Sequence, residues 1–240
     1  MSDAVVIIPT YNEIENIEAI IRAVFSQEKV FHVLVVDDNS PDQTAHKVNA
    51  LIKEYPERLF LLKRDKKSGL GTAYIAGFNW CLEKHYDFIF EMDADFSHNP
   101  DDLIKLYNAC AIDGADVSVG SRYVKGITVV NWPMSRILLS YGASRYVRLI
   151  TRMRVKDATA GFVCYKRSVL ETINLSNIRF IGYAFQIEMK FKATNKGFKI
   201  KEIPVIFKDR TQGKSKMSGS IISEAIFGVI SLKLKSLFTK

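Results

Sequence analysis

The sequence predicts an α/β protein with a mostly parallel central sheet. Short apolar runs at 5–8, 33–36 and 88–92 are rich in valine, isoleucine and phenylalanine, which is typical of strands covered on both faces. Segments with helical spacing of apolar residues alternate with these runs. Because strand–helix–strand units join neighbouring strands by right-handed crossovers, this alternation indicates a parallel sheet between layers of helices.

Each strand of the first half leads through a polar turn into a helix. After the first strand, Asn12 and Glu15 have the spacing of a capping box, which predicts a helix start ahead of Ile17. Asn99 and Pro100 predict another helix start, by an N-cap followed by proline at the first position. The remaining strands are expected at 59–62 and 117–120, and the remaining helices at 42–55 and 73–80.

The second half is less regular. Helices are predicted over 134–151 and 183–195, and strands over 162–166 and 200–207. Residues 210–219 are polar, basic and punctuated by glycine, which predicts a mobile loop. A last helix, 220–237, places its apolar residues in a broad stripe. We therefore expect a main domain over 1–219 and an amphipathic C-terminal helix over 220–240.

The composition limits the class of protein. Of the 240 residues, 48% are apolar and 25% are charged, which is ordinary for a globular domain. The net charge of +8 favours an anionic partner, such as nucleic acid, membrane headgroups or a phosphorylated substrate. The three cysteines lack disulfide or metal-ligand spacing, which suits a reducing cytoplasm. We expect no leader peptide, and no membrane span because charged residues interrupt the apolar stretch at 221–238.

Two carboxylates one residue apart, Asp93 and Asp95, directly follow the strand at 88–92. Alternation along the backbone sends both side chains to the same side. Magnesium-like cations are usually held by one or two carboxylates, with substrate phosphates supplying further oxygens. A turn or capping role would use the same residue types, so the tripeptide alone does not decide between the two interpretations.

Polar residues at the ends of other strands favour the metal interpretation. In parallel sheets, ligands bind outside the carboxyl ends of the strands. Those ends carry the segments 9–13, 37–38, 93–95 and 121–123. Besides Glu13, these segments contain four aspartates, at 37, 38, 93 and 95, and one arginine, Arg122. Their convergence predicts a metal-bound phosphate ester at this edge of the sheet.

Transfer of a sugar from a nucleotide diphosphate would need residues of these types. A cation on Asp95, with a cationic clamp, would stabilise the leaving diphosphate. Asp93 would lie near sugar hydroxyls, Asp38 would accept hydrogen bonds from base or ribose, and Tyr11 would pack on the base. The predicted clamp is made of Arg122, Arg210 and Lys216.

Several of these residues have a structural alternative. Tyr11 could pack at the entry to a helix, and Asp38 could cap the following helix. Glu188 could be a general base or make a structural hydrogen bond. His98 could be a metal ligand or a polar loop residue.

Motifs along nearly the whole chain resemble the polyprenol (dolichol) phosphate mannosyltransferases, which are inverting enzymes of glycosyltransferase family 2 with a Rossmann-like GT-A fold. They are Val-Ile-Ile-Pro-Thr-Tyr-Asn-Glu at 6–13, Val-Asp-Asp-Asn-Ser-Pro-Asp at 36–42, Gly-Leu-Gly-Thr-Ala-Tyr at 69–74 and Met-Asp-Ala-Asp-Phe-Ser-His at 92–98. The resemblance continues at 120–123, 182–189 and 209–216. It implies that residues 1–219 form a GT-A catalytic domain.

The resemblance also implies roles for individual residues. The guanosine part of GDP-mannose would be held by Pro9, Tyr11, Glu13, Val36 and Asp38. Ribose, diphosphate and a magnesium or manganese ion would be held by Asp93, Ala94 and Asp95, with Asp95 as the direct metal ligand. The donor phosphates would be held by Arg122, Arg210 and Lys216, and the acceptor phosphate by Arg122, Arg136 and Ser140. The residues implied in catalysis are Asp95, Arg122 and Lys216.

One departure concerns the metal. Some relatives carry a glutamine as second metal ligand where this chain has Ser97, so phosphate and water would hold more of the ion here.

The expected reaction is transfer of mannose from GDP-mannose to a polyprenyl phosphate at the cytoplasmic face of a membrane. The last helix could lie in the membrane interface or pack on the domain, and a membrane-protein partner is a third route to the lipid. Alternatives are a UDP-glucose donor and a non-catalytic subunit that binds nucleotide sugar. No recognised module supports nucleic-acid binding. A nicotinamide dehydrogenase is disfavoured because the first strand lacks a glycine-rich G-x-G-x-x-G turn.

Overall fold

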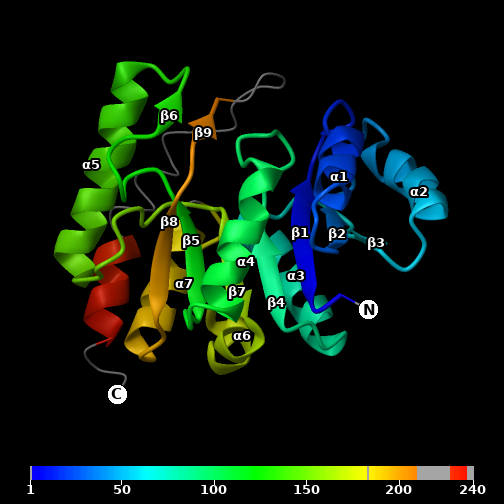
Figure 1. Cartoon of the computed structure of the whole chain (residues 1–240). Helices are drawn as coiled ribbons and strands as arrows, with labels where there is room; N and C mark the ends of the chain where they lie inside the picture. Colours follow the sequence, from blue (N-terminus) through cyan, green and yellow to red (C-terminus); the bar gives the residue numbers. More distant parts are fainter. Residues whose placement is uncertain (1, 183, 210–227, 237–240) are drawn as a thin grey trace.

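Helices cover both faces of a central sheet in the computed structural model (Figure 1). The structure describes residues 2–182, 184–209 and 228–236. The strands are β1 (Ala4–Thr10), β2 (His32–Asp37), β3 (Leu59–Lys63), β4 (Phe88–Glu91), β5 (Val117–Ser121), β6 (Val129–Val130), β7 (Val163–Lys166), β8 (Ile200–Pro204) and β9 (Phe207–Lys208). The α-helices are α1 (Ile17–Phe25), α2 (Thr44–Glu54), α3 (Leu70–Glu83), α4 (Leu103–Ala111), α5 (Met134–Thr151), α6 (Arg167–Thr172) and α7 (Ala184–Asn195). Short 3-10 helices span Pro100–Asp102 and Leu175–Asn177, and residues 228–236 are helical.

The main sheet has seven strands in the order β3-β2-β1-β4-β7-β5-β8. All neighbouring pairs are parallel except those of β7, which runs antiparallel to β4 and to β5. A separate parallel pair joins β6 to β9. The predicted mostly parallel α/β sheet is therefore confirmed.

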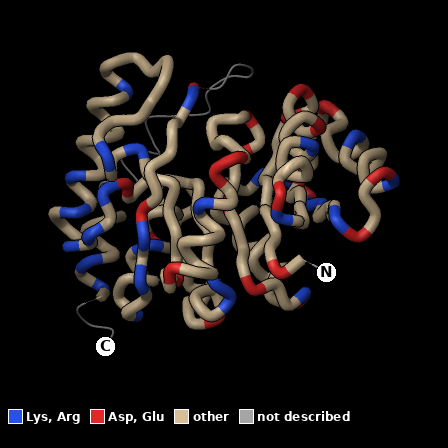
Figure 2. Tube along the Cα trace, viewed as in Figure 1, with Lys and Arg blue, Asp and Glu red and all other residues tan. Residues whose placement is uncertain are grey.

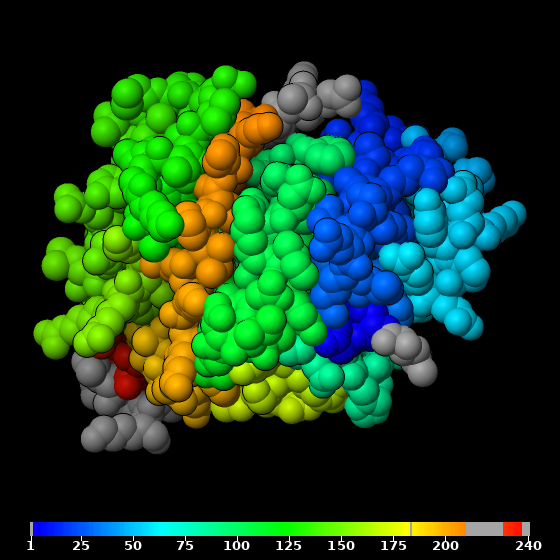
Figure 3. Space-filling view, in the orientation of Figure 1, coloured from blue at the N-terminus to red at the C-terminus, as the bar shows by residue number. Residues whose placement is uncertain are grey.

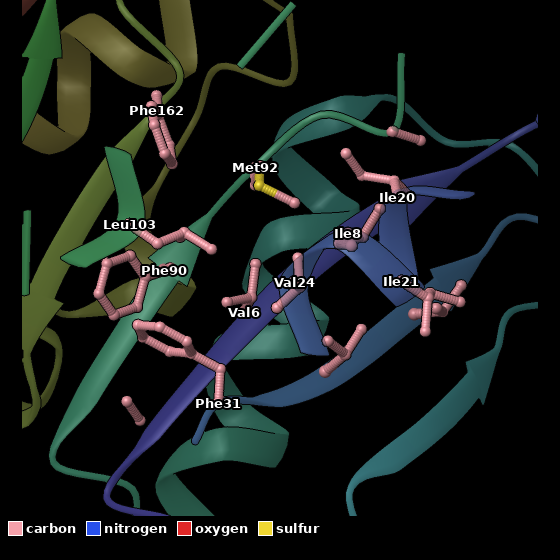
Figure 4. Packing of buried hydrophobic residues seen from close by; sticks show 14 of the residues in the cluster. Val6, Ile8, Ile20, Ile21, Val24, Phe31, Phe90, Met92, Leu103 and Phe162 are labelled. Atoms are coloured by element: carbon pink, nitrogen blue, oxygen red, sulfur yellow. The ribbon is translucent and has the colours of Figure 1, made fainter. Parts of the chain in front are cut away.

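Alternating side chains of β1 enter two different hydrophobic clusters. Val6 and Ile8 pack with α1 and α4 on one face of the sheet (Figure 4). Val5 and Ile7 pack with α3, α6 and α7 on the other face. Burial on both faces explains why the strand reads as an uninterrupted apolar run. The two halves of the sequence pack against each other as one continuous body (Figure 3).

The start of α1 differs from the prediction. Asn12 does not cap this helix: its φ is 59°, and its backbone N–H donates to Ser40 Oγ at 3.0 Å. The chain first makes a turn in which the backbone N–H groups of Asn16 and Ile17 donate to the Glu13 carbonyl. The capping box was therefore wrong, because the polar residues after β1 bond to the β2–α2 loop instead. The helix start at Asn99 and Pro100 is confirmed, since Asn99 Oδ1 accepts the Asp101 N–H at 3.2 Å.

A third cluster joins α5 and α7 to the final helical segment. It includes Val147 of α5, Ile187 of α7, and Val229 and Leu232 of residues 228–236. The described part of the last helix thus packs on the domain with one side, while Leu234 is 53% exposed. The predicted boundary at residues 219 and 220 lies outside the described residues and stays a prediction. None of the helices in the described part has the length and apolar character needed to cross a bilayer.

Phe90 should be a main determinant of stability. Its ring is fully buried and packs edge-on against Phe31 with centroids 5.5 Å apart. We expect Phe90→Ala to lower the free energy of unfolding by about 3–5 kcal/mol, from lost transfer energy and the cavity left behind. Denaturant unfolding would measure it, with Phe88→Ala as control, because Phe88 is on the same strand but only partly buried. Equal losses for the two variants would contradict this account of the core.

Candidate active site

The carboxyl ends of β2, β1 and β4 lie side by side at one edge of the sheet. The register places Thr10 opposite Asp37, and the Asp38 N–H donates to the Thr10 carbonyl at 3.0 Å. On the other side of β1, the Met92 N–H donates to the Ile7 carbonyl at 3.1 Å, immediately before Asp93. The predicted convergence of polar strand ends is confirmed, and it falls where the strand order reverses about β1.

The loop 93–98 holds its own carboxylates in place. The Asp93 N–H donates to His98 Nδ1 at 3.0 Å, and Asp95 Oδ1 accepts the Ser97 N–H at 3.1 Å. Phe96 has a φ of 59°, so the chain turns sharply between these bonds. The Asp95 side chain is thereby oriented while only 9% of the residue is exposed.

His98 has a polar loop role. Because its Nδ1 accepts a backbone N–H, the neutral ring carries its proton on Nε2, and neither nitrogen has a lone pair left for a metal. Burial lowers the pKa of His98 to about 4, so the ring stays neutral at pH 7. It stacks on Phe162 with centroids 4.9 Å apart. The metal-ligand alternative for His98 is therefore not supported.

Arg122, at the carboxyl end of β5, is held by Asp157 in a two-pronged ion pair. Its Nε donates to Asp157 Oδ2 at 2.7 Å and its Nη2 to Oδ1 at 2.6 Å. Nη2 also donates to Thr159 Oγ1 at 2.9 Å. Both partners of the ion pair are buried, with Asp157 completely covered. This fork geometry fixes the orientation of the guanidinium more firmly than a surface pair would.

A cavity of about 500 Å³ connects these residues to α5. Its polar side includes Asp93, Asp95 and Arg122, and its apolar side includes Leu139 and Val147 of α5. The cavity is also lined by Ser97, Trp132, Arg136, Ser140, Ala143, Thr159, Ala160 and Gln186. One cavity thus combines carboxylates, cations and a hydrocarbon-like wall.

The three residues expected at the acceptor phosphate, Arg122, Arg136 and Ser140, all line this cavity. Arg136 Nη1 pairs with Asp209 Oδ1 at 2.8 Å, and its guanidinium lies 3.9 Å from the centroid of the Trp132 ring. Ser140 Oγ accepts the Tyr123 hydroxyl at 2.8 Å. The structure therefore brings Arg136 and Ser140 to the same space as Asp95 and Arg122, from a different element.

The residues expected at the nucleotide base lie along the neighbouring β1–β2 edge. Asp38 Oδ1 is 3.2 Å from Arg64 Nη1, and burial raises the pKa of Asp38. Lys67 Nζ lies 4.3 Å from the centroid of the Tyr11 ring. The Glu13 N–H donates to Thr44 Oγ1 at 3.1 Å.

Three other expected donor-site residues have mainly backbone or core positions. Pro9 pairs with Val36 across β1 and β2, and the Val36 and Ala94 side chains are packed in hydrophobic clusters. Arg210 and Lys216 lie outside the described residues.

The donor set at Asp95 fits a hard divalent cation that a ligand helps to hold. Within the described residues, no group of three His, Cys, Asp or Glu side chains is arranged to hold a metal ion. Ser97 Oγ is buried and has no hydrogen-bond partner among the residues that the structure describes, and Ser97 lines the same cavity as Asp95. One carboxylate and one neutral oxygen leave most coordination positions to phosphate and water, as magnesium-type sites often do.

Sequence reasoning missed the partner of Arg122 and left two interpretations of Glu188 open. Asp157 lies in an irregular segment before β7, where one acidic residue gives no spacing signal. Glu188 is buried, and its Oε2 accepts the N–H groups of Arg179 and Phe180 at 2.9 and 3.1 Å. The structural alternative for Glu188 is therefore supported.

Comparison with known proteins gives a consistent assignment. Residues 5–173 match the family model described as glycosyl transferase family 2. The chain is 47% identical over 224 residues to a polyprenol monophosphomannose synthase of Mycolicibacterium smegmatis, covering 93% of this chain and 84% of that protein. It is 44% identical over 223 residues to an undecaprenyl-phosphate mannosyltransferase of Micrococcus luteus, covering 93% and 90%.

Solved structures share the fold at low sequence identity. A glucosyl-3-phosphoglycerate synthase of Mycobacterium tuberculosis, in complex with Mn²⁺, UDP and glucosyl-3-phosphoglycerate, superposes with a TM-score of 0.68 at 16% identity, covering 97% of this chain and 79% of that one. A mannosyltransferase of Pyrobaculum calidifontis, in complex with GDP-Man and Mn²⁺, has a TM-score of 0.60 at 16% identity, covering 98% and 74%. The GT-A-like architecture of this chain is thereby confirmed.

Burial of neutral His98 should make stability fall with acid. The pKa of about 4 in the folded protein lies below the ordinary 6.5, so between these values the unfolded chain binds more protons. The free energy of unfolding should therefore drop by about 2 kcal/mol from this group between pH 7 and pH 5. Denaturant unfolding of His98→Gln should show a pH dependence weaker by that amount than the parent protein. The exposed His46→Gln is the control, and an unchanged slope in His98→Gln would contradict the assignment.

Proposed function

Because the chain belongs to glycosyl transferase family 2, we propose that it transfers mannose from GDP-mannose to a polyprenyl (dolichyl) monophosphate. The product is polyprenyl-phosphate β-mannose, formed with inversion at the anomeric carbon. Relatives at 47% and 44% identity are named for mannose transfer to polyprenol and undecaprenyl phosphates, which supports this acceptor class. GDP-mannose as donor, and the roles of individual residues, are part of the proposal.

The observation that carries this proposal is the two-sided cavity. A polyprenyl phosphate has one anionic end and a long apolar chain. The cavity offers Arg122 and Arg136 near its acidic edge and Leu139, Ala143 and Val147 of α5 along another side. An apolar wall contributes to binding by burying apolar surface of the ligand. A water-soluble sugar acceptor would not need such a wall.

The acceptor chemistry needs positive charge more than it needs a base. A phosphate monoester is already anionic at pH 7, so its oxygen can attack the anomeric carbon without losing a proton to the protein. The bond from that carbon to the GDP diphosphate breaks, and its electron pair leaves with GDP. Arg122, held rigid by Asp157, would offset the charge brought together by the two phosphates.

Asp95 is the proposed metal-binding residue, with Ser97 Oγ beside it. A bound divalent cation would neutralise charge on the leaving diphosphate. The Mn²⁺-containing complexes of the fold neighbours support a divalent cation in general, and we propose magnesium or manganese. Arg210 and Lys216 remain proposed phosphate ligands outside the described residues.

Mannose transfer to lipid should depend on Asp95. We expect radiolabel to pass from GDP-mannose to polyprenyl phosphate with magnesium or manganese present, and Asp95→Ala to reduce the rate by about 100- to 1,000-fold, the loss typical for removing a major electrostatic group. Asp101→Ala is the matched control, because Asp101 is an exposed carboxylate in the next turn. Both variants should keep the parent's unfolding temperature within a few degrees. Full activity in Asp95→Ala would contradict the role of this carboxylate.

The same assay distinguishes GDP-mannose from UDP-glucose as the donor, and an enzyme from a non-catalytic subunit. If UDP-glucose supports transfer to lipid phosphate and raises the unfolding temperature while GDP-mannose does neither, the enzyme is a glucosyltransferase. If nucleotide sugar binds but no sugar moves to any polyprenyl phosphate, a non-catalytic subunit is indicated. Transfer to a sugar hydroxyl instead would reject the lipid acceptor.

We also propose that the protein meets its acceptor at the cytoplasmic membrane face through the outer surface of α5. Met134, Leu138, Arg145 and Leu149 recur at helical spacing along one stripe, and Met134, Leu138 and Leu149 are 67%, 64% and 79% exposed. Lys and Arg residues gather over this side of the molecule (Figure 2). An amphipathic helix with basic and apolar residues is suited to an anionic lipid surface.

Reversing this surface should weaken membrane binding without changing the fold. We expect Arg145→Glu/Leu149→Glu to reduce partition into vesicles containing anionic lipid by at least about tenfold, at roughly 1 kcal/mol per basic residue plus the lost apolar contact. The matched control is Lys53→Glu/Ile112→Glu, whose exposed residues lie on α2 and after α4. Vesicle flotation measures the difference. Equal binding by both double variants would place the lipid contact elsewhere.

A further inference from the structure

A buried lysine on α7 joins the two halves of the cavity. Lys190 is completely covered, yet its Nζ hydrogen-bonds no carboxylate in the described part of the chain. It donates to the Ala160 carbonyl at 2.6 Å, the Gln186 carbonyl at 3.2 Å and Gln186 Oε1 at 3.3 Å. A buried ammonium is costly unless its donors are satisfied, so a fully enclosed lysine needs a reason. Three hydrogen bonds supply the compensation, two of them within α7 and one to the segment that contains Ala160.

One branch leads to the acidic edge. Gln186 Nε2 donates to Glu91 Oε2 at 2.6 Å, and both side chains are buried. Glu91 is the last residue of β4, two positions before Asp93. The orientation of Glu91 therefore fixes where the chain leaves β4 and enters the loop that carries Asp95.

The other branch leads to the cationic side. Ala160, whose carbonyl Lys190 binds, closes a turn by donating its N–H to the Asp157 carbonyl at 3.4 Å. Asp157 and Thr159 of that turn hold the Arg122 guanidinium. A shift of the Ala160 carbonyl would therefore move the groups that orient Arg122.

We propose that Lys190 is a positioning residue that keeps Arg122 in register with the Asp93–Asp95 loop, so that the donor diphosphate meets both at once. The expected loss of turnover rests on the proposed function. The expected displacement of Arg122 does not depend on it. Arg122 itself touches the reacting phosphates in this account, and Lys190 acts only through Gln186 and Ala160.

The kinetic consequence is a loss of turnover with little loss of nucleotide binding. The residues at the base and ribose, Tyr11 and Asp38, lie on the β1–β2 edge, and the hydrogen bonds from Lys190 do not reach them. A misplacement of about 1 Å at the reacting groups can cost about 100-fold in rate. We therefore expect Lys190→Met to lower kcat by about 10- to 100-fold while the Kd for GDP changes less than about threefold.

The fluorescence emission of Trp132 reports on the position of Arg122 without any substrate. The Arg122 guanidinium lies 5.5 Å from the centroid of the Trp132 ring, and the chain's other tryptophan is Trp80. In a Trp80→Phe background, Lys190→Met should shift the Trp132 emission because Arg122 moves relative to the indole. A purely structural loss of stability would leave the emission of the folded protein unchanged.

Two further variants separate positioning from stability. Lys192→Met is the matched control, because Lys192 is on the same helix and bonds Glu188 at 3.1 Å, away from the cavity. It should leave kcat and Trp132 emission unchanged. Glu91→Gln/Lys190→Met removes both buried ionisable groups and should recover the unfolding temperature lost in Lys190→Met, but not kcat.

The full-length variants should be assayed below their unfolding temperatures, with the double variant used if Lys190→Met does not fold. The inference is overturned if Lys190→Met keeps kcat within about twofold, or if the double variant recovers kcat together with stability. If the parent protein transfers no mannose, the proposed function fails, and the Trp132 emission alone decides the inference: a shift in Lys190→Met and none in Lys192→Met supports it, and no shift overturns it.

Discussion

The site depends on the parallel pairing of β1 with β2 on one side and with β4 on the other. Parallel strands end at the same edge of a sheet, so this pairing brings Tyr11, Asp38 and Asp93 to one place although they are far apart in the sequence. The strand order reverses at β1, which is where open α/β sheets leave a crevice for ligands. The apolar runs allow these strands to be buried on both faces and to pair in parallel. The same pairing therefore places the acidic residues that follow the strands at one edge of the sheet.

Charges that enter the interior near this edge are compensated. Asp157 pairs with Arg122, and Glu91 is bonded through Gln186 to Lys190. Glu188 of α7 accepts two backbone N–H groups. Breaking one member of such a set leaves a buried charge without compensation, which costs far more than a surface pair does. The rigidity that results would suit the proposed mannose transfer, because oriented charges need no rearrangement as the leaving diphosphate forms.

The sequence allowed most strands, most helices and the acidic strand ends to be predicted, because apolar periodicity and strand-end position are local properties. The short strand β6 was not predicted, and the strand expected over 200–207 is divided into β8 and β9. It did not reveal that β7 would insert antiparallel between β4 and β5, since strand direction is set by tertiary pairing. The Asn12 cap failed for a similar reason: a long-range bond to Ser40 outweighed the local motif. Asp157 and Lys190 could not be identified, because a single charged residue carries no pattern until its partner is known.

The central claim is that Asp95 and the donor diphosphate share a cation beside Arg122. Crystals grown with GDP-mannose and Mn²⁺, measured for anomalous scattering by manganese, test it most directly. The account predicts an anomalous peak at the Asp95 carboxylate, in contact with the diphosphate, and the sugar directed into the cavity that α5 lines. A peak at another group of residues, or a donor bound away from Asp95 and Arg122, would contradict it.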